Sequence, residues 1–179
     1  MHIVTFGASN NINSINKQLA IYASSQFKDA RVEILDLNDF EMPIYSMERE
    51  QTSGIPEPAR RFFETIGNAN ALVISLAEHN GSYSTAFKNI LDWMSRINGR
   101  VFQDKPTLLL STSPGPRGGI TVLNAALERW PYMGAHIKGS LSLPEFYKSY
   151  NPENGITDAG LKAALLKAVQ EVENEFVLN

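Results

Sequence analysis

The chain has 179 residues, of which 43% are hydrophobic and 20% are charged, and its net charge is −3. This length suits one domain with a hydrophobic core, so we expect residues 1–179 to form a single domain. The acidic balance argues against a nucleic-acid-binding protein, and no apolar run approaches the roughly 20 residues that span a bilayer, so we expect no membrane partner.

Segments with a strand pattern alternate with segments of helical periodicity. "ALVISL" is a continuous apolar run, typical of a strand that is covered on both faces. By contrast, Phe87, Ile90, Leu91 and Met94 recur on one face of a helix. In chain order, the predicted elements are strand His2–Phe6, helix Asn16–Phe27, strand Arg31–Leu35, an irregular stretch Asp36–Ser53, a helix from Pro56 to Ile66, strand Ala71–Leu76, helix Thr85–Ile97, strand Pro106–Leu110, helix Ile120–Trp130 ending at Pro131, strand Ala135–Leu143, and helix Asp158–Val177 capped by Thr157.

This alternation indicates the fold class. Five strands separated by helices predict parallel pairing with right-handed crossovers, and therefore an α/β fold, a doubly wound three-layer sandwich. Ligands of such folds bind beyond the carboxyl ends of the strands. The rule directs attention to three loops, Gly7–Asn16, Ala77–Thr85 and Ser111–Gly119.

The first loop, "GASNNINSIN", is rich in amides and hydroxyls and contains no acidic residue. It has neither the GxGxxG turn of dinucleotide folds nor the GxxxxGK[ST] loop of nucleotide triphosphatases. Ser9, Asn11 and Ser14 can donate hydrogen bonds, and the N–H groups at a helix start attract negative charge. The loop therefore suits an anion such as a phosphate. The alternative is that its serines and asparagines only cap the helix and fill a turn.

The other two loops also have unusual composition. In the second, Asn80-Gly81 is a tight-turn dipeptide that can bring the backbone close to a flat ligand, or can be a plain turn before an N-cap at Ser84. The third loop, "STSPGPRGG", combines two prolines with three glycines, which exposes backbone N–H groups on a rigid loop, although it can also be an ordinary connection. Three such loops at one edge of a sheet favour a ligand site.

All three loops match a set of family signatures. The first signature reads roughly G-S-x-R-x-x-S-x-N, and "GASNNINSIN" matches it at the serines and at the last asparagine. The second, roughly P-E-Y-N-x-S-x-x-x-x-L-K-N-x-x-D-W, is matched by "EHNGS" and "FKNILDW", and the third by "STSPGPRGG". By these motifs the chain resembles the NADPH-dependent FMN reductase family, which includes quinone, azo-dye and chromate reductases. Asn11 stands where the family has arginine, and His79 where it has tyrosine.

The resemblance implies a flavodoxin-like fold with a five-stranded parallel sheet in the order 2-1-3-4-5. It implies FMN as the cofactor, NADPH or NADH as the reductant, and a quinone, a free flavin or a similar small molecule as the electron acceptor. No side chain is implied as a general acid or base, because the flavin carries the redox chemistry. The implied FMN-binding residues are Ser9, Asn11, Ser14, Ile15, Asn16, Ala77, Glu78, His79, Asn80, Gly81, Ser113, Gly115, Gly118 and Gly119.

The resemblance also implies a homodimer, with a tetramer as the alternative. Trp93 and the irregular stretch Asp36–Ser53 are the candidates to help close the partner's flavin site. We also expect a cytoplasmic protein without a bound metal. The chain contains no cysteine, no group of His, Asp or Glu has the spacing of a metal site, and no leader pattern precedes the first strand.

Two other functions compete with the reductase. One is an electron carrier of flavodoxin type, which binds FMN without direct nicotinamide turnover, although such carriers tend to be strongly acidic. The other is a flavin-free α/β hydrolase, against which the Gly-x-Ser-x-Gly nucleophile elbow is absent.

Overall fold

The computed structural model describes residues 1–177 and contains a five-stranded parallel sheet in the order β2-β1-β3-β6-β7. Numbered within the sheet alone, this order is 2-1-3-4-5, which confirms the predicted fold class. The strands of this sheet are β1 (His2–Ala8), β2 (Arg31–Ile34), β3 (Ala71–Leu76), β6 (Lys105–Thr112) and β7 (Ala135–Leu143). The register pairs Thr5 of β1 with Ile34 of β2 on one side and with Val73 of β3 on the other.

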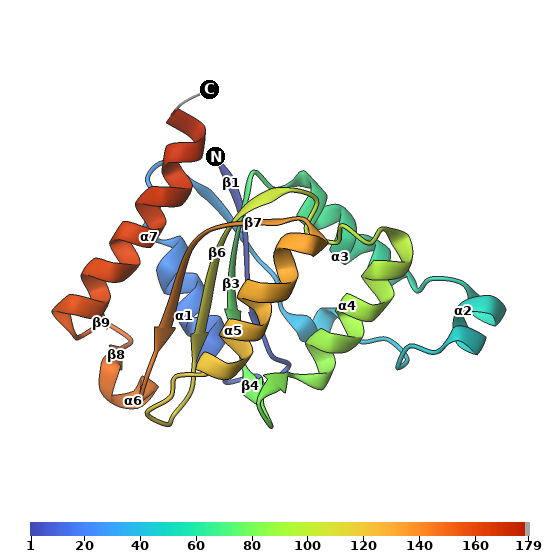
Figure 1. Cartoon of the computed structure of the whole chain (residues 1–179), viewed down its shortest axis with the longest axis horizontal. Coiled ribbons are helices and arrows are strands. Elements are labelled where there is room, and N and C mark those ends of the chain that lie inside the picture. The colour runs from blue at the N-terminus through green and yellow to red at the C-terminus, as the bar shows by residue number, and fades with distance from the viewer. Residues whose placement is uncertain (178–179) are drawn as a thin grey trace.

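Helices cover both faces of the sheet (Figure 1). One layer holds α1 (Ile15–Ser24) and α7 (Ala159–Val177). The other layer holds α3 (Glu57–Asn68), α4 (Thr85–Ile97) and α5 (Ile120–Arg129). Among the described residues, no helix is both long and apolar enough to cross a membrane.

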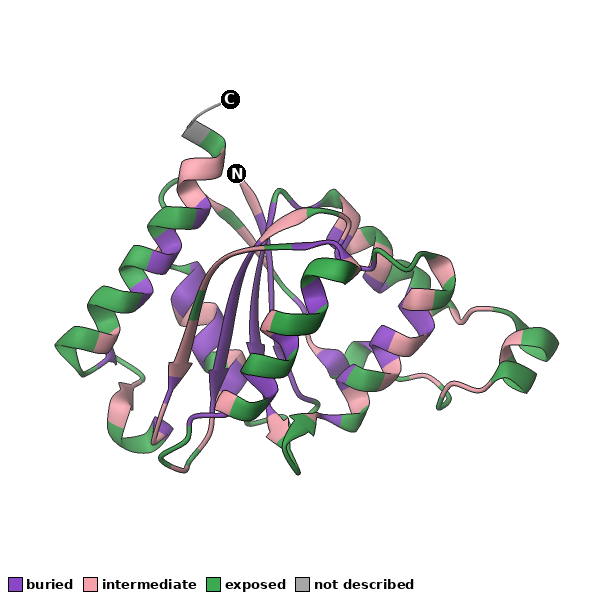
Figure 2. Ribbon diagram, viewed as in Figure 1, coloured by how far each residue is buried: buried purple, intermediate pink, exposed green. Residues whose placement is uncertain are grey.

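Two hydrophobic cores follow from the alternation of side chains along each strand. In β3, Leu72 and Ile74 face the layer of α3, α4 and α5, whereas Val73 faces α1 and α7. All six residues of β3 are buried, as the apolar run predicted. Figure 2 shows the same burial along the central strands.

The stretch predicted to be irregular, Asp36–Ser53, contains two short helices, so that prediction was wrong in part. They are the 3₁₀ turn η1 (Leu37–Phe40) and the helix α2 (Met47–Ser53). No residue of α2 is buried, and this helix stands out from the body of the molecule (Figures 1 and 2). A helix without a buried face leaves no hydrophobic periodicity in the sequence, which is why the pattern did not reveal it.

The remaining short elements were also not predicted. They are the hairpin strands β4 (Glu78–His79) and β5 (Ser82–Tyr83), the 3₁₀ turn η2 (Trp130–Met133), the short helix α6 (Phe146–Ser149), and the hairpin strands β8 (Tyr150–Asn151) and β9 (Gly155–Ile156). Thr157 does not cap α7, because it directly follows β9 and its hydroxyl donates to the carbonyl of Lys148. The carboxylate of Asp158 accepts from the N–H of Leu161 at 2.8 Å instead.

Candidate functional site

The three predicted loops meet at the carboxyl edge of the sheet and enclose a cavity of about 200 Å³. Nine of the fourteen predicted site residues line it, namely Ser9, Asn11, Ser14, Ile15, Asn16, Ala77, Glu78, His79 and Ser113. Four further lining residues were not predicted, namely Asn13, Thr112, Pro114 and Tyr147. The structure thus brings the three loops together at one cavity, and it separates the residues that line this cavity from those that do not.

The first wall is the turn between β1 and α1. A Cβ on Gly7 would lie 2.3 Å from the backbone nitrogen of Lys17, so only glycine lets α1 begin this close to the end of β1. Ser14 is the N-cap, and its side-chain oxygen accepts from the N–H of Lys17 at 3.1 Å. The N–H groups of Ile15 and Asn16 begin the helix and have no acceptor within it. This turn therefore presents backbone donors to the cavity.

The side chain of Asn16 has a structural role that the sequence did not reveal. It is 3% exposed, and its oxygen accepts from the hydroxyl of Ser75 at 2.7 Å and from the N–H of Thr112 at 3.1 Å. Its amide nitrogen donates to the carbonyl of Thr112 at 3.2 Å. Asn16 thus joins α1 to the carboxyl ends of β3 and β6 through its side chain, and its backbone N–H, in the first turn of the helix, is a donor for a ligand.

The second wall is the loop between β3 and α4. Asn80 (φ 53°) and Gly81 (φ 75°) form the turn of the hairpin β4–β5, beyond the cavity lining. Glu78 lines the cavity, but its carboxylate accepts from the N–H of Val122 at 3.0 Å, at the start of α5. Ser84 caps α4, as one reading of the loop predicted, and its hydroxyl donates to the carbonyl of Ala8 at 2.8 Å.

The third wall is the loop between β6 and α5. Ser113 lines the cavity, whereas Gly115, Gly118 and Gly119 do not. Gly118 has a φ of 56°, and a Cβ there would lie 2.5 Å from the Oγ of Ser142. Two of the three predicted glycines, Gly118 and Gly119, have left-handed backbone conformations that let this loop turn sharply into α5. Their contribution is to the shape of the loop.

A second cavity of about 430 Å³ adjoins the first and shares His79 with it. It lies between η1, the segment that follows η1, and the first turns of α4. Its lining combines apolar and polar side chains, namely Asn10, Leu37, Asn38, Phe40, Glu41, Met42, Ile44, His79, Thr85, Ala86, Asn89 and Ile90. Among the described residues, neither cavity is lined by a lysine or an arginine.

Lys17 belongs to the first turn of α1, but its side chain points away from the smaller cavity. The Nζ of Lys17 lies 2.5 Å from the Oδ2 of Asp36, outside the cavity lining. The hydrogen bond from Lys17, together with the N–H of Asn38, holds the pKa of the Asp36 carboxyl below its usual value. The donors of the smaller cavity are therefore neutral hydroxyls, amides and backbone N–H groups, which fit a phosphate at a helix N-terminus.

Comparison with known proteins identifies the family. The model of the NADPH-dependent FMN reductase family matches residues 1–147. The chain belongs to this family. Its members are oxidoreductases, and the family name specifies FMN and a nicotinamide reductant, which confirms the resemblance seen in the sequence.

Curated relatives in this family include named reductases. The chain is 38% identical over 108 residues to a 2-hydroxy-1,4-benzoquinone reductase of Burkholderia sp, which covers 59% of this chain and 57% of that protein. It is 33% identical over 79 residues to a quinone reductase of Escherichia coli, covering 44% and 42%. The chain thus matches about half the length of these two relatives.

Solved structures of flavin enzymes share the fold. The flavoenzyme NAD(P)H:(acceptor) oxidoreductase FerB from Paracoccus denitrificans has a TM-score of 0.73 at 22% identity, covering 97% of both chains. An apo form of the NADH:FMN oxidoreductase EMOB also has a TM-score of 0.73 at 18% identity, covering 97% of this chain and 89% of that one. At these identities the likeness extends to the fold alone.

Proposed function

We propose that this chain is an FMN-dependent NAD(P)H oxidoreductase that passes electrons from a reduced nicotinamide, through bound FMN, to a small acceptor. In this proposal residues 1–179 act as one domain in the cytoplasm. The observation that carries it is a group of neutral donors at the start of α1, which we call the cradle: the hydroxyls of Ser9 and Ser14 and the N–H groups of Ile15 and Asn16. The cradle lies at the carboxyl edge of a flavodoxin-like sheet. Membership of the FMN reductase family supports the same cofactor.

The three loops divide the binding of FMN between them. Ser9, Ser14 and the N–H groups of Ile15 and Asn16 would hold the phosphate, because a helix N-terminus favours an anion. The loops Ala77–Gly81 and Ser113–Gly119 would hold the rings. When bound, FMN supplies the capacity to take up and return two electrons. Glu78 fixes the hairpin β4–β5 against α5, and so fixes the wall that the rings would contact.

We propose an uncharged quinone as the acceptor class and the larger cavity as its route to the flavin. That cavity meets the cradle at His79 and pairs apolar side chains, such as Phe40 and Met42, with the amides of Asn10 and Asn38. Its described lining includes the carboxylate of Glu41 and no cation to pair with an anionic acceptor, and it lacks the donors at the start of α1 that favour an anion in the smaller cavity. Two relatives named as benzoquinone and quinone reductases support this choice.

The test is spectroscopic and kinetic. Purified protein titrated with FMN should show the absorption bands of bound flavin, and the loaded protein should oxidise NADPH or NADH rapidly when a benzoquinone is added. A protein that takes up no FMN would contradict the whole proposal. A protein that binds FMN but does not turn over reduced nicotinamide would instead be an electron carrier of flavodoxin type.

We further propose a homodimer in which the segment 42–54 contacts the partner. Ile44 and Met47 in this segment are 66% and 62% exposed, and together they offer apolar surface for a partner to cover. Trp93, the other candidate for closing the partner's site, is 1% exposed, and its Nε1 donates to the carbonyl of Pro43, so it acts within its own chain. Light scattering should give the mass of a dimer, and Met47→Glu should shift it toward the monomer.

A further inference from the structure

Tyr147 forms a wall of the smaller cavity that none of the three loops supplies. It belongs to the short helix α6, which follows β7, and it is the only described lining residue from that part of the chain. Its side chain is 73% exposed at the cavity mouth, although the preceding residue, Phe146, is 3% exposed. The exposed ring of Tyr147 thus follows a buried residue and lies beside the hydrogen-bond donors of the cradle, and this position needs a physical explanation.

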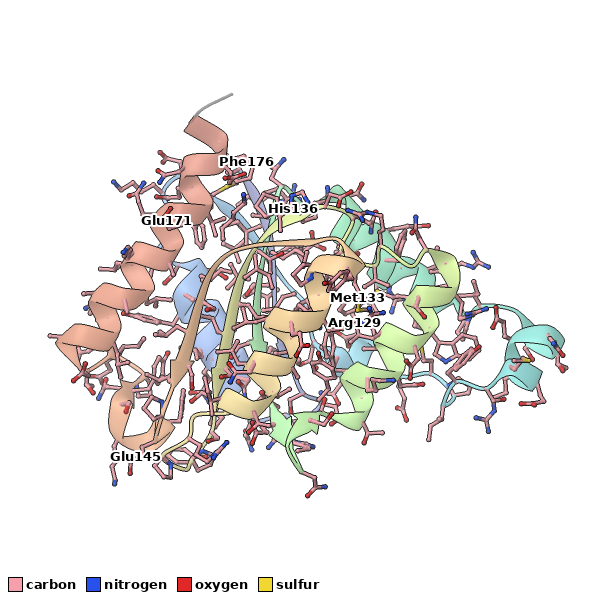
Figure 3. All side chains as sticks on the ribbon, in the orientation of Figure 1. Arg129, Met133, His136, Glu145, Glu171 and Phe176 are labelled. Carbon is pink, nitrogen blue, oxygen red and sulfur yellow. The ribbon has the colours of Figure 1, made fainter. Side chains whose placement is uncertain are left out.

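The backbone directs this residue toward the cavity. The N–H of Phe146 donates to the carbonyl of Ser113 at 3.1 Å, and the N–H of Glu145 donates to the carbonyl of Gly115 at 2.9 Å. Glu145 itself has a φ of 46°, a left-handed conformation that costs a non-glycine residue about 1 kcal/mol or more. Figure 3 shows Glu145 at the end of the molecule where β7 finishes. These contacts join the start of α6 to the third ligand loop.

A row of aromatic rings places Tyr147 in the layer of α1. The rings of Phe146 and Tyr147 meet edge to face at 5.6 Å, and Phe146 stacks on Tyr150 at 4.7 Å. Tyr150 in turn meets Tyr22, a residue of α1, at 5.7 Å. The hairpin β4–β5 lies against α5, in the other layer, where Glu78 bonds to the start of that helix. The ring contacts thus connect Tyr147 to the layer of α1, and the cavity lining that it shares with Ser14 and Ile15 brings it to the start of that helix.

We propose that Tyr147 is a further FMN-binding residue, whose phenolic hydroxyl donates a hydrogen bond to the FMN phosphate. This inference rests on the proposed function. The donors of the cradle are neutral, and among the described residues no lysine or arginine lines it. A phenolic O–H aimed at a phosphate makes a charge-assisted hydrogen bond, which is stronger than a bond between two neutral groups. Asn11 replaces the family arginine and carries no charge, so it cannot form an ion pair with the phosphate. Tyr147 would supply part of the anion binding that is lost in this way.

The experiment compares FMN with riboflavin, which lacks the phosphate, by titrating the quenching of flavin fluorescence. Tyr147→Phe removes only the hydroxyl, and we expect its FMN dissociation constant to rise roughly 10- to 100-fold, as for the loss of one hydrogen bond to a charged group. The riboflavin constant should change less than about twofold. The matched control is Tyr132→Phe. Tyr132 is equally exposed, at 75%, but belongs to η2, before β7 and away from both cavities.

Three other results would overturn the inference. An equal loss for FMN and riboflavin in Tyr147→Phe would show that the hydroxyl does not act on the phosphate. Unchanged affinities in Tyr147→Phe, with weaker binding of both flavins in Tyr147→Ala, would mean that the ring stacks on the flavin instead. If the wild-type protein binds neither flavin, the proposed function itself fails, and the inference fails with it. Thermal unfolding of each variant will show that the fold is retained.

Discussion

The carboxylate of Glu78 and the backbone N–H of Val122 lie 3.0 Å apart, and this hydrogen bond ties the second ligand loop to the start of α5. Val122 is the third residue of α5, whose N-cap, Gly119, offers no side chain. Glu78 therefore caps the helix from a distant part of the chain and places a negative charge at its N-terminus, where the helix dipole favours it.

We expect Glu78→Ala to lower the free energy of unfolding by about 1 kcal/mol, the usual cost of losing such a cap. Urea unfolding measures this change. Glu128→Gln is the control, because Glu128 is exposed near the other end of α5, and we expect its effect to stay within about 0.5 kcal/mol. Equal stability of wild type and Glu78→Ala would mean that the hydrogen bond to Val122 contributes nothing to the fold.

The parts of the fold that the sequence predicted are those set by local pattern. "ALVISL" became a strand buried at every position, and Ser84 caps α4, as one of the two interpretations of the second loop predicted. The helix α2 was not predicted because residues distant in the sequence stabilise it. The Nε of Arg96 donates to Glu50 at 2.9 Å, and the ring of Tyr45, just before α2, packs edge to face on Trp93. Contacts between residues about 50 positions apart leave no periodic signal.

In the site, too, local pattern predicted some features and tertiary contacts decided the others. Loop composition predicted where a ligand would bind, but it could not separate residues that face the cavity from residues that shape it. Asn16 looked like a donor and proved to bridge β3 and β6 through its side chain. Gly118 looked like an exposed backbone and proved to pack against Ser142. Tyr147 was missed because it reaches the cavity through tertiary contacts alone.

Gly7 allows a second prediction about the cradle. A Cβ at this position would lie 2.3 Å from the backbone nitrogen of Lys17 and 2.8 Å from the carbonyl carbon of Asn16. Since both atoms are backbone, Gly7→Ala must displace the first turn of α1. We expect a loss of roughly 1–3 kcal/mol in the free energy of unfolding, together with weaker FMN binding.

Urea unfolding and an FMN titration measure the two effects of Gly7→Ala. Gly99→Ala is the matched control, because a Cβ at Gly99 would meet nothing within 4 Å and its φ is not positive. This control should change the free energy of unfolding by less than about 0.5 kcal/mol. A Gly7→Ala protein as stable as the control, with unchanged FMN affinity, would show that α1 shifts freely.

Ser14 offers a test of where the phosphate binds that does not disturb the fold. Aspartate is as good an N-cap as serine, so Ser14→Asp should keep the stability of α1. It adds a carboxylate to the cradle, and repulsion from the phosphate should weaken FMN binding on the order of 100-fold or more. Ser9→Asp should act in the same direction.

Fluorescence titration measures this loss of affinity. Gln170→Glu controls for the change in net charge, since it adds one negative charge at an exposed position of α7 that lines neither cavity, and we expect it to leave FMN affinity unchanged. Full FMN affinity in both Ser14→Asp and Ser9→Asp would place the phosphate outside the cradle.

The ion pair between Lys17 and Asp36 predicts how stability varies with pH. Lys17 holds the pKa of the Asp36 carboxyl below its usual value, so the folded pKa lies below the pKa of about 3.9 expected in the unfolded chain. The stabilisation is therefore fully present above that unfolded value, and it is lost as the pH falls through the folded pKa. Both side chains are about 30% exposed, which keeps the contribution near 0.5–1 kcal/mol.

We expect Asp36→Asn to be less stable than wild type by about this amount at neutral pH, and the difference to shrink as the pH falls below about 4. Asparagine keeps the shape and an oxygen for the N–H of Asn38, so the comparison isolates the charge. Urea unfolding of both proteins over this pH range measures it, with Asp92→Asn, in the more exposed pair with Lys88, as the control. A difference that stays constant with pH would show that Asp36 stabilises the fold through its hydrogen bonds rather than its charge.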